Sequence, residues 1–159
     1  MLQLETFDRQ TAARAVLLAV VTVLIAACAT LSTSPAPTPA DFPGITTELA
    51  KRGIVVDHIV AGDAGCADPV LAPTAIRADV HGLDQASPTR IYVYIFRNRA
   101  TFERLRPTVD ACARSYVSDP QAFGSVEASP FVVAGPGPWG PGFAQALRDA
   151  LTVAAGTGD

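Results

Sequence analysis

The sequence predicts an α+β fold, in which two or three helices pack on one face of a roughly four-stranded, mostly antiparallel sheet. Two patterns indicate this class. Residues 74–82 alternate between apolar and polar side chains, which is typical of a half-buried strand. Residues 98–116 place apolar side chains at steps of three and four, which is typical of an amphipathic helix. A ferredoxin-like variant of the fold requires residues 61–73 to act as the first crossover.

An uncharged apolar run precedes the predicted domain and ends at a cysteine. It covers residues 16–28 and follows Arg9 and Arg14. A basic start, an apolar core and small residues at the end are the parts of a secretory signal. Its last four residues, Ile25-Ala26-Ala27-Cys28, match the lipobox at every position, so the segment resembles the signal peptide of bacterial lipoproteins.

The resemblance covers only residues 1–28 and implies that a diacylglyceryl group is attached to the sulfur of Cys28. It also implies that a signal peptidase cuts just before this residue. Two acyl chains hold a protein firmly at a membrane surface, whereas one chain holds it weakly. The expected organisation is a removed signal peptide (1–27), lipidated Cys28 with a linker rich in Pro, Ser and Ala (28–43), and one α+β domain (44–159).

Two other fates of this segment stay open. Residues 15–31 could remain as an uncleaved anchor, although a spanning helix needs about 20 apolar residues. Cleavage after Ala29, at a site with small residues, would instead release the protein. The start of the chain is also less basic than usual, because it contains Glu5 and Asp8. All three fates place the domain outside the cytoplasm, and lipidation anchors it to the cell membrane.

The first part of the domain reads as linker, helix and strand. Residues 29–40 contain three prolines and no charge, so they favour an extended linker. A first helix is expected over residues 41–52, and Gly53 is a natural stop. Residues 54–60 are rich in β-branched side chains and predict a strand. The following segment, 61–73, is rich in Gly, Asp, Ala and Pro and predicts a loop.

The second part contains the strongest strand. Residues 89–96 carry apolar or aromatic side chains on both faces, so we expect both faces to be covered, and a hairpin with residues 74–82. Asn98 can cap the next helix, and Pro107 predicts a kink or a restart within it. One further strand is expected over residues 125–134. A last helix begins at Pro141 and ends before residue 156.

Once Cys28 is assigned to the signal, two cysteines remain in the domain, Cys66 and Cys112. In an exported chain, an even number of cysteines predicts disulfide pairing, so we expect one disulfide between them. Cys112 lies on the apolar stripe of the second helix, so the disulfide would join that helix to the 61–73 loop. The chain-entropy argument gives about 4 kcal/mol for a closed loop of this size.

Composition and motifs exclude several functions. The net charge of −3 argues against a nucleic-acid partner. Residues 135–140, GPGPWG, match G-x-G-x-x-G in letters. However, two prolines remove backbone donors, and the chain ends too soon for a second strand with an acidic ribose partner. We therefore expect a rigid connecting loop and no cofactor. No catalytic motif is found.

Five side chains are the candidate binding residues. Tyr92, Tyr94 and Trp139 offer aromatic surface, although for Trp139 we favour the alternative that it folds back onto the core. Arg97 and Arg104 lack an oppositely charged residue four positions away, so they could contact anionic lipid or polymer.

No metal site is expected from the two histidines. Asp57 and His58 are adjacent on a strand and should face opposite ways, while Asp79 and His81 share a face but supply only two ligands.

These observations predict a membrane-anchored extracytoplasmic lipoprotein that binds a ligand or partner in the cell envelope. The expected partners are membrane lipid, through acylated Cys28, and an envelope protein or small ligand. The alternatives are a structural or accessory envelope protein and, third, a small extracytoplasmic hydrolase. The third ranks last because no nucleophile motif is present.

Overall fold

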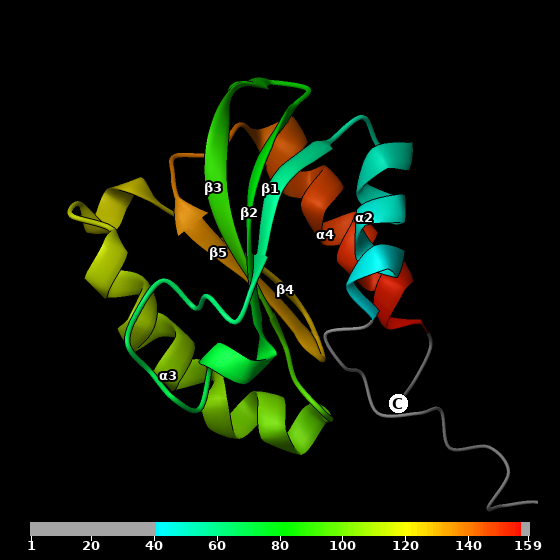
Figure 1. Ribbon diagram of the computed structural model, residues 1–159. Coiled ribbons are helices and arrows are strands. Elements are labelled where there is room, and N and C mark those ends of the chain that lie inside the picture. The colour runs from blue at the N-terminus through cyan, green and yellow to red at the C-terminus, as the bar shows by residue number, and fades with distance from the viewer. Residues whose placement is uncertain (1–40, 157–159) are drawn as a thin grey trace, which may run out of the picture. The chain divides into compact units, whose positions relative to one another are not determined.

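The protein is described by a computed structural model over residues 41–156. One antiparallel sheet runs through this region, with strand order β1-β2-β3-β5-β4 (Figure 1). The strands are β1 (Val55–Ala61), β2 (Ala75–Gly82), β3 (Gln85–Ile95), β4 (Phe123–Ala128) and β5 (Phe131–Pro136). The helices are α2 (Phe42–Lys51), α3 (Arg99–Tyr116) and α4 (Pro141–Ala155), with short 3-10 turns at Ala72–Thr74 and Pro120–Ala122. The predicted α+β class with a mostly antiparallel sheet is confirmed.

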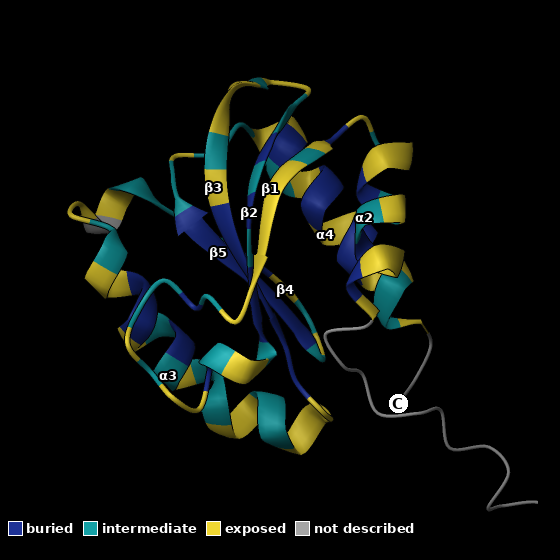
Figure 2. Ribbon diagram, viewed as in Figure 1, coloured by how far each residue is buried: buried dark blue, intermediate teal, exposed yellow. Residues whose placement is uncertain are grey.

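The helices cover both faces of the sheet, and not one face as expected. Helices α2 and α4 lie together on one face, and α3 lies on the other (Figure 1). The expected burial of β3 on both sides is confirmed, because Ile91, Val93 and Ile95 belong to one core cluster and Tyr92 and Tyr94 belong to the other. Figure 2 shows β5 buried over most of its length and β3 buried in its second half, while β1 is exposed along most of its length.

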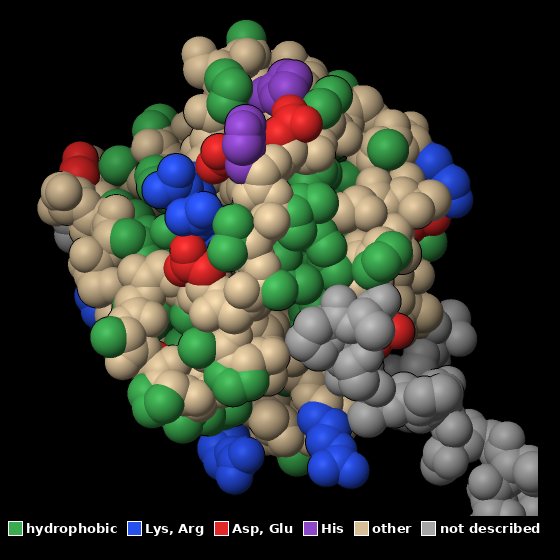
Figure 3. Space-filling view, viewed as in Figure 1, with side chains coloured by type: hydrophobic (Ala, Val, Ile, Leu, Met, Phe, Trp, Pro, Cys, Tyr) green, Lys and Arg blue, Asp and Glu red, His purple; other side chains and the backbone are tan. Residues whose placement is uncertain are grey.

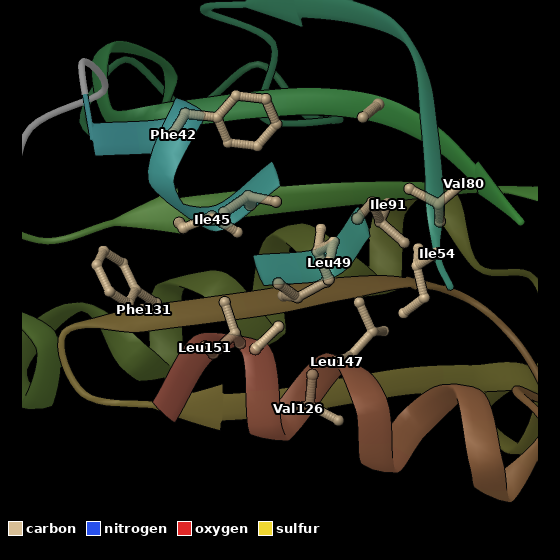
Figure 4. Close-up of a cluster of buried hydrophobic side chains, with 14 of the residues drawn as sticks. Phe42, Ile45, Leu49, Ile54, Val80, Ile91, Val126, Phe131, Leu147 and Leu151 are labelled. Carbon is tan, nitrogen blue, oxygen red and sulfur yellow. The ribbon is translucent and has the colours of Figure 1, made fainter. Parts of the chain in front are cut away.

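The larger core lies between the sheet and the α2–α4 pair. Side chains of α2 and α4 meet residues of the sheet there, and Figure 4 shows the interlocking of Ile45 and Leu49 with Leu147 and Leu151. Each of these four side chains is essentially inaccessible to solvent. Burying such a side chain stabilises the fold by about 1.5–3 kcal/mol, so this contact fixes both helices on the sheet.

A hairpin stands where one strand over residues 125–134 was expected. Strands β4 and β5 pair from Phe123 with Pro136 to Ala128 with Phe131, and Ser129-Pro130 forms the turn. Strand β5 then pairs with β3, which places it between its hairpin partner and β3. The sheet consequently has five strands.

The order of the strands differs from the ferredoxin-like variant. Strand β1 pairs antiparallel with β2, its neighbour in sequence. Residues 62–74 therefore connect two adjacent strands and do not act as a crossover. This connection contains a short 3-10 turn at Ala72–Thr74.

The predicted helix ends agree with the structure. Asn98 caps α3, because its side chain accepts a hydrogen bond from the backbone N–H of Thr101 at 2.9 Å. Pro107 stands inside α3, which continues through it and changes direction along its length (Figure 1). Pro141 is the first residue of α4, and Gly156 ends it with a positive φ of 68°.

Candidate functional site

An open groove lies between α2 and β1, with a volume of about 490 Å³. Its walls include Thr46 and Ala50 from α2, Ile54 just before β1, and Val55 and Val56 at the start of β1. Figure 3 shows hydrophobic side chains gathered along this boundary between the helix and the strand. The groove forms because Gly53, with φ of 78°, turns the chain directly from the helix into the strand. The arrangement resembles no motif in the sequence, so sequence reasoning missed it.

The strand beside this groove is an edge of the sheet. One side of β1 pairs with β2, and its other side has no neighbouring strand within residues 41–156. Three apolar side chains of β1 are exposed: Val55 by 47%, Ile59 by 52% and Val60 by 38%. A free strand edge with exposed apolar side chains offers backbone N–H and C=O groups to another extended chain.

A β-bulge interrupts β1 after its first three residues. The register shifts between Asp57 and Val60, so two residues, His58 and Ile59, lie opposite one residue of β2. His58 has a positive φ of 49°. The bulge overturns the expectation that Asp57 and His58 face opposite ways, because both approach the face of β2 that carries Asp79 and His81.

These four residues form a His–Asp cluster: Asp57, His58, Asp79 and His81. His58 Nδ1 lies 3.5 Å from an Asp79 carboxylate oxygen, and His81 Nδ1 lies 4.0 Å from an Asp57 oxygen. Arg90 also reaches Asp79, with its Nε 3.4 Å from the carboxylate. Figure 3 shows histidine, acidic and basic side chains side by side there. The cluster lies on the opposite face of β2 from Ala78 and Val80, which face α2 and α4.

The cluster consists of two His–Asp contacts and one Arg90–Asp79 ion pair at the surface. Exposed pairs of this kind contribute little to stability and mainly set the local charge of a surface. Within the part of the chain that the structure describes, no three His, Cys, Asp or Glu side chains are placed to hold a metal ion. The cluster therefore supplies a charged surface beside β1.

Tyr92 and Tyr94 belong to the core on the α3 side. Tyr94 is fully buried and Tyr92 is 6% exposed. The Tyr94 hydroxyl donates a hydrogen bond to the backbone oxygen of Ala64 at 2.8 Å, and the Tyr92 ring packs on Tyr116 with ring centroids 4.5 Å apart. The expectation that Tyr92 and Tyr94 offer a binding surface is corrected, because both rings are buried in the core beneath the 62–74 connection.

The predicted disulfide joins Cys66 to Cys112. It links the 62–74 connection to α3, as expected, and it lies beside the tyrosines, because Cys112 and Tyr94 belong to the same buried cluster. This buried hydrophobic cluster on the α3 side surrounds the phenol groups and keeps most water away from them. Burial consequently raises the pKa of Tyr116 to about 12, and it raises the pKa values of Tyr92 and Tyr94 as well.

Trp139 folds back onto the protein, as favoured from the sequence. Its indole N–H donates to the backbone oxygen of Pro136 at 2.8 Å, and its ring meets Phe143 edge to face at 5.9 Å. It packs against the α2–α4 core, whereas Tyr92 and Tyr94 lie in the core on the other face. The structure thus does not bring the three aromatic candidates together.

The arginines of α3 form two ion pairs at the four-residue spacing that favours them on a helix. The Arg99–Glu103 pair forms at 2.9 Å, and Arg106 binds Asp110. Arg106 also bonds Glu127 of β4 at 2.5 Å.

Asp110 is thus occupied by Arg106, and among the described residues Arg114 has no ion pair. Arg97 and Arg104 are exposed and likewise pair with no described carboxylate. A smaller cavity of about 280 Å³ lies beside Arg114, between the end of α3 and Phe123.

The sequence matches no protein-family model, and comparisons with curated proteins and with solved structures also give no match. Within residues 41–156, none of the helices combines the length and the apolar character needed to cross a bilayer. The candidate site consists of the free edge of β1, with an apolar groove on one side and the His–Asp cluster on the other.

Proposed function

We propose that this protein is a lipid-anchored module of the cell envelope that binds an extended polypeptide segment along β1. The observation that carries the proposal is the free edge of β1 next to the groove against α2. A segment that adds to an exposed edge gains main-chain hydrogen bonds, and pockets for its alternate side chains give specificity.

The export and anchoring parts rest on the cysteines. Cys28 lies outside the described residues, and its lipidation is inferred from the lipobox that ends at this position. The disulfide between Cys66 and Cys112 supports export, because structural disulfides persist in oxidising compartments and are rare in the cytosol. An anchored domain with an accessible strand edge suits the capture of a partner at the membrane surface.

The two faces of the sheet would read different side chains of the bound segment. Successive side chains of a strand point to opposite faces. In a segment added to β1, one set would enter the groove formed with α2, which is lined largely by apolar groups. The other set would lie on the side of the His–Asp cluster, where Asp57 and His58 are close to the edge. We therefore propose a ligand in which apolar residues alternate with polar or charged ones.

The test is selection of peptides from a displayed random library on the full-length protein in lipid vesicles. Selected peptides should share apolar residues at every second position. N-methylation at alternate residues in one register should weaken binding at least tenfold, and in the other register it should have little effect, because only one set of N–H groups faces the edge. Equal loss in both registers, or enrichment without alternation, would overturn the proposal.

A matched pair of variants locates the site. Ala50→Arg places a long side chain in the groove from the exposed face of α2 and should abolish peptide binding. Ala111→Arg makes the same change on the exposed face of α3 and should leave binding unchanged. Analytical sedimentation tests whether a second copy of this chain occupies the edge instead of a peptide. A concentration-dependent dimer that Ala50→Arg dissociates would assign the edge to that second copy.

A further inference from the structure

The end of the domain where α3 begins carries basic side chains without carboxylate partners. Arg97 precedes the Asn98 cap and Arg104 lies two turns further on, and both are exposed. Arg99, between them, pairs with Glu103. Figure 3 shows basic side chains protruding at this end of the molecule. The local surface is therefore positive, although the whole chain has a net charge of −3.

The chain also enters the domain at this end. Arg97 lies two residues after Ile95, the last residue of β3, and Ile95 pairs with Phe131. Phe42, the first residue of α2, shares the core cluster of these two residues. Figure 4 shows Phe42 and Phe131 near the same end of the core, away from Ile54 and Val80. The residue where the linker joins the domain, Asp41, is thus on the same end as Arg97.

The length of the linker limits how far this end can move from the anchor. Twelve residues, 29–40, separate Cys28 from Asp41. A proline-rich segment extends about 3.1 Å per residue, so the steps from Cys28 to Asp41 span about 40 Å. We propose that, in the lipid-anchored protein, Arg97 and Arg104 dock on anionic phospholipid headgroups and hold the domain upright. The inference rests on the proposed lipidation of Cys28.

The binding of the two arginines to headgroups is expected to be weak, but sufficient for a domain that is already tethered. Each basic group near an anionic leaflet strengthens binding about fivefold, so the pair contributes about 25-fold. Tethering raises the effective concentration of the second contact to the millimolar range, which lets a weak interaction persist. The contribution is local, since charges are screened over about 8 Å at physiological salt.

Arg114 provides the matched control. It is an exposed arginine of the same helix without an ion pair in the described part of the chain, but it lies ten residues after Arg104. Ten residues of helix rise by about 15 Å. Figure 1 shows α3 turning away from the end where it begins. Arg114 should therefore lie outside the range of the headgroup charges.

The experiment compares full-length acylated protein in vesicles of phosphatidylcholine alone and of phosphatidylcholine with phosphatidylglycerol. Hydrogen exchange is measured over the first two turns of α3. We expect slower exchange on the anionic vesicles, and a return to the phosphatidylcholine rate in the double variant Arg97→Gln, Arg104→Gln or at high salt. Arg114→Gln should keep the slower rate. Unchanged circular dichroism verifies that each variant folds.

The two levels of the inference fail differently. If the wild-type protein does not float with vesicles in a density gradient, the lipid anchor is wrong and the docking with it. If it floats but exchanges at the same rate on both vesicles, the docking alone is overturned. The docking is also overturned if Arg114→Gln removes the effect as fully as the double variant does.

Discussion

Asp84 caps α4 from a distant turn: its carboxylate accepts a hydrogen bond from the backbone N–H of Phe143 at 2.7 Å. The other carboxylate oxygen accepts from Gly142 at 2.8 Å. Asp84 stands in the turn between β2 and β3, so this pair of bonds attaches the hairpin to the start of the last helix. Gly140 is required beside it, because a Cβ there would overlap the Asp84 carboxylate.

Replacing Asp84 should destabilise the domain at neutral pH. Asp84→Ala leaves two helical N–H groups without this acceptor, while Asp84→Asn keeps one acceptor oxygen. We expect a lower thermal midpoint for both variants and a larger drop for alanine, measured by circular dichroism. Asp149→Asn, an exposed change in the middle of α4, is the control and should have little effect.

The pH dependence of this cap has a defined sign. The two backbone hydrogen bonds lower the pKa of Asp84 below its ordinary value of 3.8. The folded state therefore favours the charged form, and the contribution is present above the ordinary value and lost as the pH falls through the lowered one. The gap between the wild type and Asp84→Asn should shrink in acid. A constant gap from neutral pH to pH 2 would contradict the charged cap.

The disulfide should contribute about 4 kcal/mol to the free energy of unfolding, because it closes 46 residues of sequence separation. Urea unfolding of the double variant Cys66→Ala, Cys112→Ala gives this difference and leaves neither partner of the disulfide as a lone thiol. Thiol titration of the denatured, unreduced protein should detect neither cysteine. Detection of both would refute the bond.

The three tyrosines should resist ionisation in the folded protein. Burial raises all three pKa values, that of Tyr116 to about 12. Absorbance at alkaline pH should show little phenolate near pH 10 in native protein and a normal titration in denaturant. Since the unfolded tyrosines ionise first, stability is retained below about pH 10 and is lost as the pH rises toward 12.

A pair of glycine substitutions tests the packing of Trp139. A Cβ at Gly124 would overlap the indole ring, so Gly124→Ala should displace the ring and cost about 1–3 kcal/mol. Gly44→Ala on α2 is the control, because no atom lies within 4 Å of its added Cβ. Trp139 is the single tryptophan, so its fluorescence reports the displacement directly. A red shift is expected for Gly124→Ala alone.

Local signals predicted most elements of this fold. The Asn98 cap, the proline at the start of α4 and the apolar stripe that carries Cys112 depend on neighbours within a few turns. The β4–β5 hairpin also has a local signal, because Ser129-Pro130 is a turn dipeptide between apolar runs.

The remaining features depend on contacts between distant residues. Asp84 and Phe143 are 59 residues apart, and nothing near Asp84 in sequence indicates a helix to cap. The bulge at His58 is a property of the β1–β2 register and brings two His–Asp pairs together without a sequence motif. The groove arises where α2 meets β1 in space, so periodicity in either segment could not reveal it.

The only lysine of the chain is Lys51, at the end of α2 next to the groove residue Ala50. Its ammonium pairs with Glu48 at 2.6 Å and its side chain is largely exposed. Amine-reactive reagents therefore have a single side-chain target in this protein, beside the proposed peptide site. A crosslinker directed at amines should capture whatever occupies the groove, and a bound peptide should shield Lys51 from modification.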